Sequence, residues 1–214
     1  MIFPGMDERL LIATTNPAKL AEYRLLLADY PLKLVSLRDL GIADEPEETA
    51  ATFSENALLK ARFYFRLAQL PTLADDGGLE VDALGGAPGV NSHRWLGAEA
   101  DDRMLADEIV RRMAEVADGQ RAARIRCALA LAYRRDGAAM ERVVEAAIEG
   151  VVARQVHYPV RAGFPYRAVL YLPERGCYLA QLGEEEEARI GQRRTAIERA
   201  DAHLREIARM RCAS

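Results

Sequence analysis

Short apolar runs alternate with amphipathic stretches at the start of the chain. Residues 10–14 (LLIAT) form an unbroken apolar run that predicts a buried strand, and residues 32–37 (LKLVSL) alternate as a second strand does. Between them, Asn16 and Pro17 are the residue types that cap a helix and open its first turn, and helical spacing continues to Leu27. The pattern therefore predicts a strand, a helix and a strand in succession.

Two longer helices are expected before the middle of the chain. Thr52 and Glu55 stand in a capping-box relation that opens a helix over about residues 53–70, and this helix carries an apolar stripe. Residues 101–116 place charges on one side and apolar residues on the other, as a second amphipathic helix does. Between the two helices, residues 79–84 alternate like a short strand.

The second half of the chain is richer in strand patterns. Strands are predicted over residues 125–133, 143–152, 168–172 and 177–182. Residues 184–211 predict a long charged helix in two parts, broken near Gly191. The chain shows no internal repeat and no clear linker, so we expect one α/β domain spanning residues 1–214, with mixed strand order.

The composition indicates a globular protein and limits the kinds of molecule that it could bind. Hydrophobic residues make up 50% of the 214 residues and charged residues 29%, which is typical of a globular domain. A net charge of −4 argues against a surface that coats nucleic acid, and no stretch approaches membrane-spanning length. The three cysteines match no zinc spacing and no redox pair. We therefore expect a cytoplasmic protein without a nucleic-acid or membrane partner.

The most informative chemistry lies at two adjacent acids. Asp75 and Asp76 end an apolar stretch and are followed by Gly77 and Gly78. Neighbouring carboxylates repel each other unless solvent, a cationic side chain or a hard cation such as Mg²⁺ compensates them. The two glycines would allow a tight turn beside whatever the acids hold. The alternative for these residues taken alone is an acidic surface turn.

A second candidate site follows the first strand. Thr14, Thr15 and Asn16 form a polar turn between that strand and a helix N-terminus, a geometry that binds phosphate through free N–H groups and the helix dipole. Lys19 would add a positive charge there. The alternative is an ordinary strand-to-helix junction with an exposed lysine.

Three motifs in order resemble one enzyme family. They are TTNPAK at residues 14–19, EETAATFSENALLKA at residues 47–61 and ADDGGLEVDALGGAPGVNSHRWLG at residues 74–97. Their order and spacing are similar to those of the inosine/xanthosine triphosphate pyrophosphatases, which hydrolyse deaminated purine nucleoside triphosphates to the monophosphate and pyrophosphate. The resemblance is strong in the first half of the chain and weak in the second. The Maf-like nucleotide pyrophosphatases share this architecture, but TTNPAK does not fit their serine- and arginine-rich first motif.

The resemblance implies a fold, a cofactor and an assembly. The expected fold is an elongated, two-lobed α/β structure, with a central twisted mixed sheet flanked by helices and a nucleotide cleft between the lobes. The family requires Mg²⁺, and most of its members are homodimers.

The same resemblance assigns roles to individual residues. Substrate contacts are implied for Thr14, Thr15, Asn16, Lys19, Gly77, Phe164, Tyr166 and Arg193. Metal binding is implied for Glu47 or Glu48 and for the two aspartates, with Asp76 as metal ligand and catalytic base and Asp75 supporting it. Lys19 would help to neutralise the triphosphate during catalysis. For Glu55 the capping role is a sufficient explanation, and His93 is taken as a structural loop residue.

The second half departs from the family in its base-reading segments. Phe164 and Tyr166 keep an aromatic platform, but Arg167 replaces the acid of that segment. Further on, Glu187 replaces a lysine and Gln192 replaces a histidine. We hypothesise that Arg167 and Glu187 exchanged signs as a pair and preserve a salt bridge in reversed polarity.

Two functions remain open at this point. The first is Mg²⁺-dependent hydrolysis of non-standard nucleoside triphosphates, with an original or an altered base preference. The alternative is a catalytically impaired nucleotide-binding protein of the same fold, with a regulatory or interaction role. The chain retains Lys19, Asp76 and an acidic loop at residues 44–48 (DEPEE). These favour the enzyme, because a protein that only binds need not keep a metal–carboxylate site.

Overall fold

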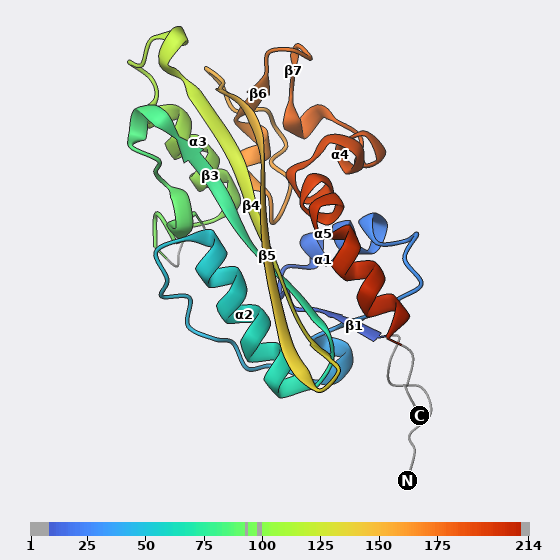
Figure 1. Ribbon diagram of the computed structural model, residues 1–214. Coiled ribbons are helices and arrows are strands. Elements are labelled where there is room, and N and C mark those ends of the chain that lie inside the picture. The colour runs from blue at the N-terminus through green and yellow to red at the C-terminus, as the bar shows by residue number, and fades with distance from the viewer. Residues whose placement is uncertain (1–8, 93, 98–99, 211–214) are drawn as a thin grey trace. The chain divides into compact units, whose positions relative to one another are not determined.

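A mixed β-sheet organises the chain in the computed structural model, which describes residues 9–92, 94–97 and 100–210 (Figure 1). In the described residues the sheet has seven strands in the order β2-β1-β3-β4-β5-β6-β7. The strands are β1 (Arg9–Ile12), β2 (Lys33–Ser36), β3 (Thr72–Val81), β4 (Ala122–Arg135), β5 (Ala138–Val152), β6 (Leu170–Leu172) and β7 (Cys177–Tyr178). Strand β1 pairs in parallel with β2 and β3, whereas β6 pairs antiparallel with β5 and β7, so the expected mixed strand order is confirmed.

The helices follow the amphipathic stretches of the sequence. They are α1 (Pro17–Leu26), α2 (Phe53–Ala68), α3 (Asp102–Arg112), α4 (Glu184–Ile190) and α5 (Gln192–Arg209). The predicted caps of the first two are confirmed: the side chain of Asn16 caps α1, and the Thr52 hydroxyl accepts from the backbone N–H of Glu55. The predicted break is confirmed too, because Gly191 separates α4 from α5. No helix in the described part of the chain is long and apolar enough to cross a membrane.

The glycines after the two aspartates do not make a turn, so that prediction was wrong. Strand β3 runs without interruption from Thr72 to Val81 and contains both aspartates and both glycines. A Cβ atom at Gly77 would lie 2.3 Å from the carbonyl oxygen of Arg126, and one at Gly78 would lie 2.0 Å from the Ser92 hydroxyl. The glycines therefore allow close approach of neighbouring chain segments.

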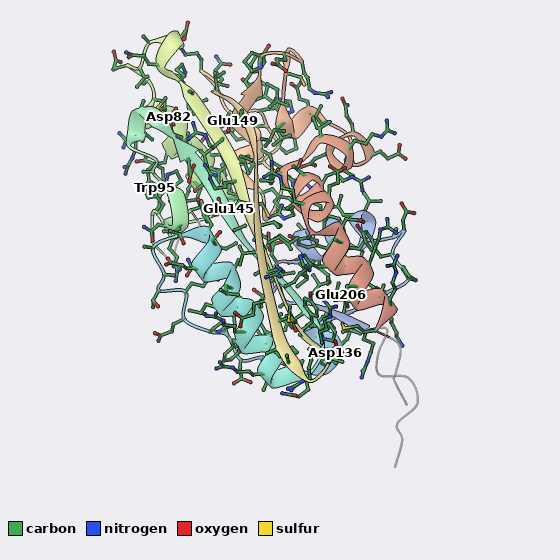
Figure 2. All side chains as sticks on the ribbon, viewed as in Figure 1. Asp82, Trp95, Asp136, Glu145, Glu149 and Glu206 are labelled. Atoms are coloured by element: carbon green, nitrogen blue, oxygen red, sulfur yellow. The ribbon has the colours of Figure 1, made fainter. Side chains whose placement is uncertain are left out.

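Other strands also begin or end at residues different from those predicted. The strand expected over residues 79–84 is the end of β3, followed by a 3₁₀ turn at Asp82–Leu84. The strand expected over residues 177–182 stops at Tyr178, because a 3₁₀ turn follows in which the Gln181 side chain accepts from the Tyr178 N–H. Strands β4 and β5 extend beyond the expected bounds into charged residues, which are stabilised by cross-strand ion pairs. Arg124 is one of these residues and binds both Asp82 and Glu149, which Figure 2 labels.

Two compact units divide the chain, and each has its own buried core. The first unit contains residues up to 76, residues 128–145 and residues from 193 onward, and the second contains residues 77–127 and 146–192. The first therefore holds β1, β2, α1, α2 and most of α5, and the second holds α3, β6, β7 and α4. In the second unit the apolar face of α3 contacts the 3₁₀ turn Pro165–Ala168. The expected nucleotide cleft and the single domain remain predictions.

Candidate active site

Two neighbouring carboxylates are separated by the geometry of a strand. Asp75 and Asp76 are consecutive residues of β3, and successive side chains of a strand point to opposite faces. Asp75 contacts side chains of α1 and α5, whereas Asp76 contacts a side chain of α2. The mutual repulsion expected for adjacent acids is therefore relieved by two different sets of cations.

Asp75 is buried between two cationic side chains. The Lys19 ammonium lies 3.3 Å from both of its oxygens, and the Arg193 guanidinium donates to Oδ2 from 3.0 Å. Burial alone would raise the pKa of Asp75, but the charges of Lys19 and Arg193 outweigh it and hold the pKa below its ordinary value. Arg193 also donates to Glu22 of α1 at 3.1 Å. Asp75 and Glu22 thus fix the direction of the Arg193 side chain.

The N-terminus of α1 brings the predicted phosphate-binding residues together. The Asn16 side-chain oxygen accepts from the N–H groups of Ala18 and Lys19, at 2.9 and 3.2 Å, and Thr14 Oγ1 accepts from the Asn16 N–H. Those two helix N–H groups are consequently already capped. A phosphate at this turn would depend on the Lys19 ammonium and on the hydroxyl of the exposed Thr15 more than on the helix terminus itself.

Asp76 belongs to a second cluster, with Lys60 and Glu48. The Lys60 ammonium lies 3.2 Å from Asp76 Oδ1 and 3.0 Å from Glu48 Oε1. The other carboxylate oxygen of Asp76, Oδ2, is buried and has no hydrogen-bond partner among the described residues. Burial raises the pKa of Asp76, the charge of Lys60 opposes the rise, and the charge of Glu48 adds to it. Burial would lower the pKa of Lys60, but Asp76 and Glu48 outweigh it and raise that pKa.

A buried asparagine holds the acidic loop against α2. The Asn56 side chain accepts from the N–H of Ala50 at 3.0 Å, and its amide lies 3.5 Å from the Ala50 carbonyl oxygen. This anchor places Glu48 beside Lys60, whereas Glu47 is exposed. Of the two glutamates predicted as metal ligands, Glu48 is therefore the one that contacts the lysine bound to Asp76.

The donor set around Asp76 fits a magnesium ion that is completed by its substrate. Among the described residues, no three His, Cys, Asp or Glu side chains form a group that could hold a metal by themselves. Mg²⁺ commonly binds one or two carboxylates and takes substrate phosphates and water as its other ligands. Asp76 and Glu48 supply such a pair, and the orphaned Oδ2 of Asp76 is an oxygen suited to a hard cation.

Lys60 is the member of this cluster that was not assigned a site role from the sequence. It follows Ala57 by three residues and precedes Tyr64 by four, so it lies on the buried face of α2. A lysine on a buried helical face needs an acidic partner, and that signal was available. Glu55 is exposed and accepts from the Thr52 hydroxyl, which confirms its place in the cap.

The reversed charge pair in the second unit is confirmed. Arg167 Nη1 lies 2.5 Å from Glu187 Oε1, and both side chains are buried. Arg161, which is more exposed, approaches the other oxygen of Glu187 at 3.3 Å. The Arg167 guanidinium carbon also lies 3.6 Å from the centre of the Phe164 ring. Glu187 is thus held by two arginines, and the Arg161 guanidinium carbon also lies over the Phe164 ring, 5.3 Å from its centre.

The two predicted base-stacking rings are both buried. Tyr166 belongs to the apolar core of its unit, and its hydroxyl donates to the Ser92 carbonyl oxygen at 2.5 Å. Burial raises the pKa of Tyr166. One face of Phe164 is covered by Arg167. Gln192 is buried as well, and His93 lies outside the described residues.

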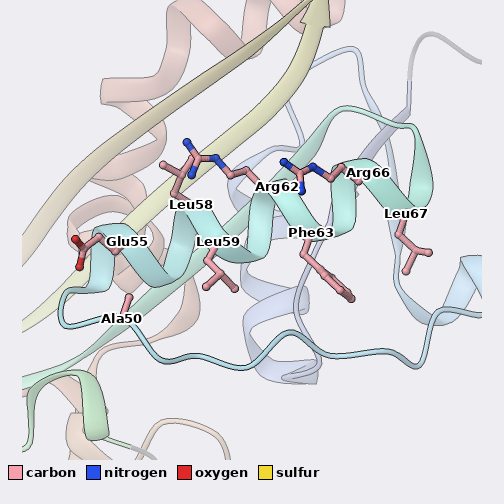
Figure 3. Close-up of a pocket in the computed structure, with 8 residues that line it drawn as sticks. All are labelled: Ala50, Glu55, Leu58, Leu59, Arg62, Phe63, Arg66 and Leu67. Atoms are coloured by element: carbon pink, nitrogen blue, oxygen red, sulfur yellow. The ribbon is translucent and has the colours of Figure 1, made fainter.

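The outer face of α2 carries a separate pocket of about 840 Å³ (Figure 3). Figure 3 shows Leu59, Phe63 and Leu67 pointing to the same side of the helix. None of the residues assigned to phosphate or metal binding lines it. The pocket is therefore distinct from the Asp76 cluster.

Comparisons with known proteins identify the family. The sequence model of the Ham1 family matches residues 10–203. The chain is 40% identical to the dITP/XTP pyrophosphatase of Geobacillus kaustophilus over 94% of its own length and 96% of that protein. It is 38% identical to the dITP/XTP pyrophosphatase of Escherichia coli strain K12 over 89% of its own length and 94% of that protein. The structure of a HAM1 protein from Coxiella burnetii superposes with a TM-score of 0.80 at 32% identity, covering 92% of this chain and 98% of that one. The resemblance drawn from the three motifs is thereby confirmed, and the chain belongs to the Ham1 family.

Proposed function

We propose that this protein hydrolyses non-standard nucleoside triphosphates, such as those of deaminated purines, to the monophosphate and pyrophosphate with the help of Mg²⁺. The relatives that share most of its length are named dITP/XTP pyrophosphatases. The observation that carries the proposal is the buried Asp76 carboxylate, with one oxygen orphaned and Glu48 reaching the same lysine. A protein that only bound nucleotides would not need this costly arrangement.

The proposed chemistry distributes four roles over the first unit. Asp76 and Glu48 would hold Mg²⁺, which supplies charge neutralisation on the triphosphate when it is bound. Asp76 would also orient the attacking water and accept its proton, a role favoured by its raised pKa. Lys19 would neutralise phosphate oxygens, with Thr14, Thr15 and Asn16 forming the adjoining turn. Asp75 would position Lys19 and Arg193. It would not need to bind the metal itself, because these two cationic side chains already bind its carboxylate oxygens.

The proposal also covers the domain organisation, the localisation, the assembly and the remaining substrate contacts. We take residues 1–214 as one catalytic domain that acts in the cytoplasm as a homodimer, with no nucleic-acid or membrane partner. Gly77 would contribute to substrate binding through its backbone, since the Arg126 carbonyl oxygen leaves no space for a side chain there. Phe164, Tyr166 and Arg193 would contact substrate, as the resemblance implies. For Phe164 this requires that Arg161 and Arg167 uncover the ring.

The test is pyrophosphate release with Mg²⁺ across inosine, xanthosine and the four standard ribonucleoside triphosphates, together with their deoxy forms. We expect turnover of inosine or xanthosine triphosphate that chelation of the metal abolishes. Preferred turnover of another base would show that the reversed Arg167–Glu187 pair changed base selection. Binding without pyrophosphate release from any triphosphate would overturn the proposal in favour of a nucleotide-binding protein.

A further inference from the structure

One ammonium group contacts both carboxylates that the proposed function assigns to the metal. Lys60 Nζ lies within 3.2 Å of Asp76 Oδ1 and at 3.0 Å from Glu48 Oε1. The Lys60 and Asp76 side chains are 12% and 11% exposed, so water screens this pair weakly. The lysine therefore already compensates part of the negative charge to which a divalent cation would be attracted.

A bound lysine and a bound cation exclude each other here. Lys60 contacts one oxygen of each carboxylate, Asp76 Oδ1 and Glu48 Oε1, so a cation held by the same two carboxylates would lie close to the ammonium. In a poorly screened site the two positive charges would repel each other strongly. The ammonium would have to leave by rotation of the side chain. The Lys60 backbone is fixed in the middle of α2, which is capped by Thr52 and tied to the acidic loop through Asn56.

We propose that Lys60 is an exchangeable counter-ion of the metal site. In the nucleotide-free protein its ammonium holds Asp76 and Glu48 together, and it must release them before Mg²⁺ binds. The inference rests on the proposed function only for the identity of the ligand that then receives the ammonium, a phosphate oxygen of the nucleotide. The consequence is that Mg²⁺ binds weakly to the protein alone and tightly together with the triphosphate. Before the substrate binds, Asp76 and Glu48 therefore hold the lysine and no metal ion.

The competing explanation gives Lys60 a purely structural role. In that case, removing its charge would leave two close carboxylates uncompensated and destabilise the fold, but the affinity for metal would not rise. Metal affinity in the absence of nucleotide therefore separates the two explanations, whereas activity does not.

The experiment is calorimetric titration of Mn²⁺ into the full chain without nucleotide. We expect Lys60→Met to bind Mn²⁺ at least tenfold more tightly than the unmodified protein. The double variant Lys60→Met with Asp76→Asn should lose this gain. Equal or weaker binding by Lys60→Met would overturn the proposal. If Lys60→Met does not fold by circular dichroism, Lys60→Gln takes its place with the same expected direction.

A matched control removes the same charge from the same helix. Arg62 is exposed on α2 and pairs with Glu141, away from the two carboxylates. Arg62→Met should leave Mn²⁺ affinity unchanged, and an equal gain there would attribute the effect to net charge and overturn the proposal. Because no nucleotide is present, tighter Mn²⁺ binding by Lys60→Met together with absent turnover by the unmodified protein would reject the proposed function alone.

Discussion

Arg167 and Glu187 form a buried ion pair, with the guanidinium nitrogen 2.5 Å from the carboxylate oxygen. The motif resemblance implies an acid at the first position and a lysine at the second, so on that alignment this chain keeps the pair with its charges reversed. Because both side chains are removed from water, loss of either one leaves a buried charge less well compensated, although Arg161 would still contact Glu187. The pair therefore constrains which substitutions the second unit tolerates.

Single substitutions of this pair should be strongly destabilising. We expect Arg167→Asp or Glu187→Lys alone to lower the free energy of unfolding by about 3–5 kcal/mol, as breaking buried pairs does. The double reversal should recover most of this loss, but not all, because Arg161 would then face an ammonium. Urea denaturation of the three variants measures the coupling. Losses that simply add would show that the two residues do not act as a pair.

The same double variant tests base selection. If the reversed pair reads the base, the ratio of turnover between inosine triphosphate and the standard triphosphates should change in the double variant. Restored stability with an unchanged ratio would assign the pair to the structure of the second unit alone.

Asp76→Asn should abolish most activity without unfolding the protein. The amide cannot accept a proton from water and is a poor ligand for a hard cation, so we expect a loss of pyrophosphate release of about 10²-fold to 10⁴-fold or more. Asp82→Asn is the control, since Asp82 follows the same strand and pairs with the surface residue Arg124. Activity of Asp76→Asn within a few-fold of the unmodified protein would contradict the role given to Asp76.

The two aspartates should have opposite effects on the pH dependence of stability. The folded-state pKa of Asp75 is lowered, so its stabilisation is present above the ordinary aspartate pKa and is lost as pH falls through the folded value. Asp75→Asn should therefore cost about 3 kcal/mol or more at pH 7, and the cost should shrink in acid. Chemical denaturation across a pH series measures both effects.

For Asp76 the sign is reversed. Its folded-state pKa is raised, so the free energy of unfolding falls as pH rises from the ordinary aspartate value through the raised one. Asp76→Asn should accordingly cost less stability at pH 7 than Asp75→Asn does. The opposite order would show that the pairing of Asp76 with Lys60 dominates over its burial.

Gly77→Ala should destabilise the protein although the backbone of Gly77 is ordinary strand. Its new methyl group would lie 2.3 Å from the backbone carbonyl oxygen of Arg126, so the strands must separate. We expect a loss of about 1–3 kcal/mol. Gly119→Ala, at a position with open space around it, should change stability by less than about 0.5 kcal/mol. Equal melting temperatures for the two variants would refute the packing argument.

Parts of this structure could be predicted from interactions between residues close together in the chain. Asn16 and Thr52 cap helices because their side-chain oxygens reach N–H groups only two or three residues away, which depends on the local chain alone. The break at Gly191 and the mixed sheet followed from periodicity in the same way. The ion pair of Arg167 and Glu187 could be predicted from the sequence, because a basic residue replaces an acid in one recognisable motif and an acid replaces a lysine in another.

Long-range contacts decided what local chemistry could not. Gly77 and Gly78 resemble a turn in sequence, but they form a strand because Arg126 and Ser92 approach them closely. Asp75 and Asp76 resemble a single acidic site, but the alternation of side chains along β3 gives each a different cation. Lys60 gained its importance from acids 12 and 16 residues away in sequence.

The sequence by itself determined the family and the capped starts of α1 and α2, because these are carried by residues close together in the chain. Only the tertiary structure decided which carboxylate meets which cation, that Glu48 shares Lys60 with Asp76, and that Arg167 covers Phe164. The physical reason is that burial and charge compensation depend on segments far apart in the sequence, whose approach no local pattern encodes.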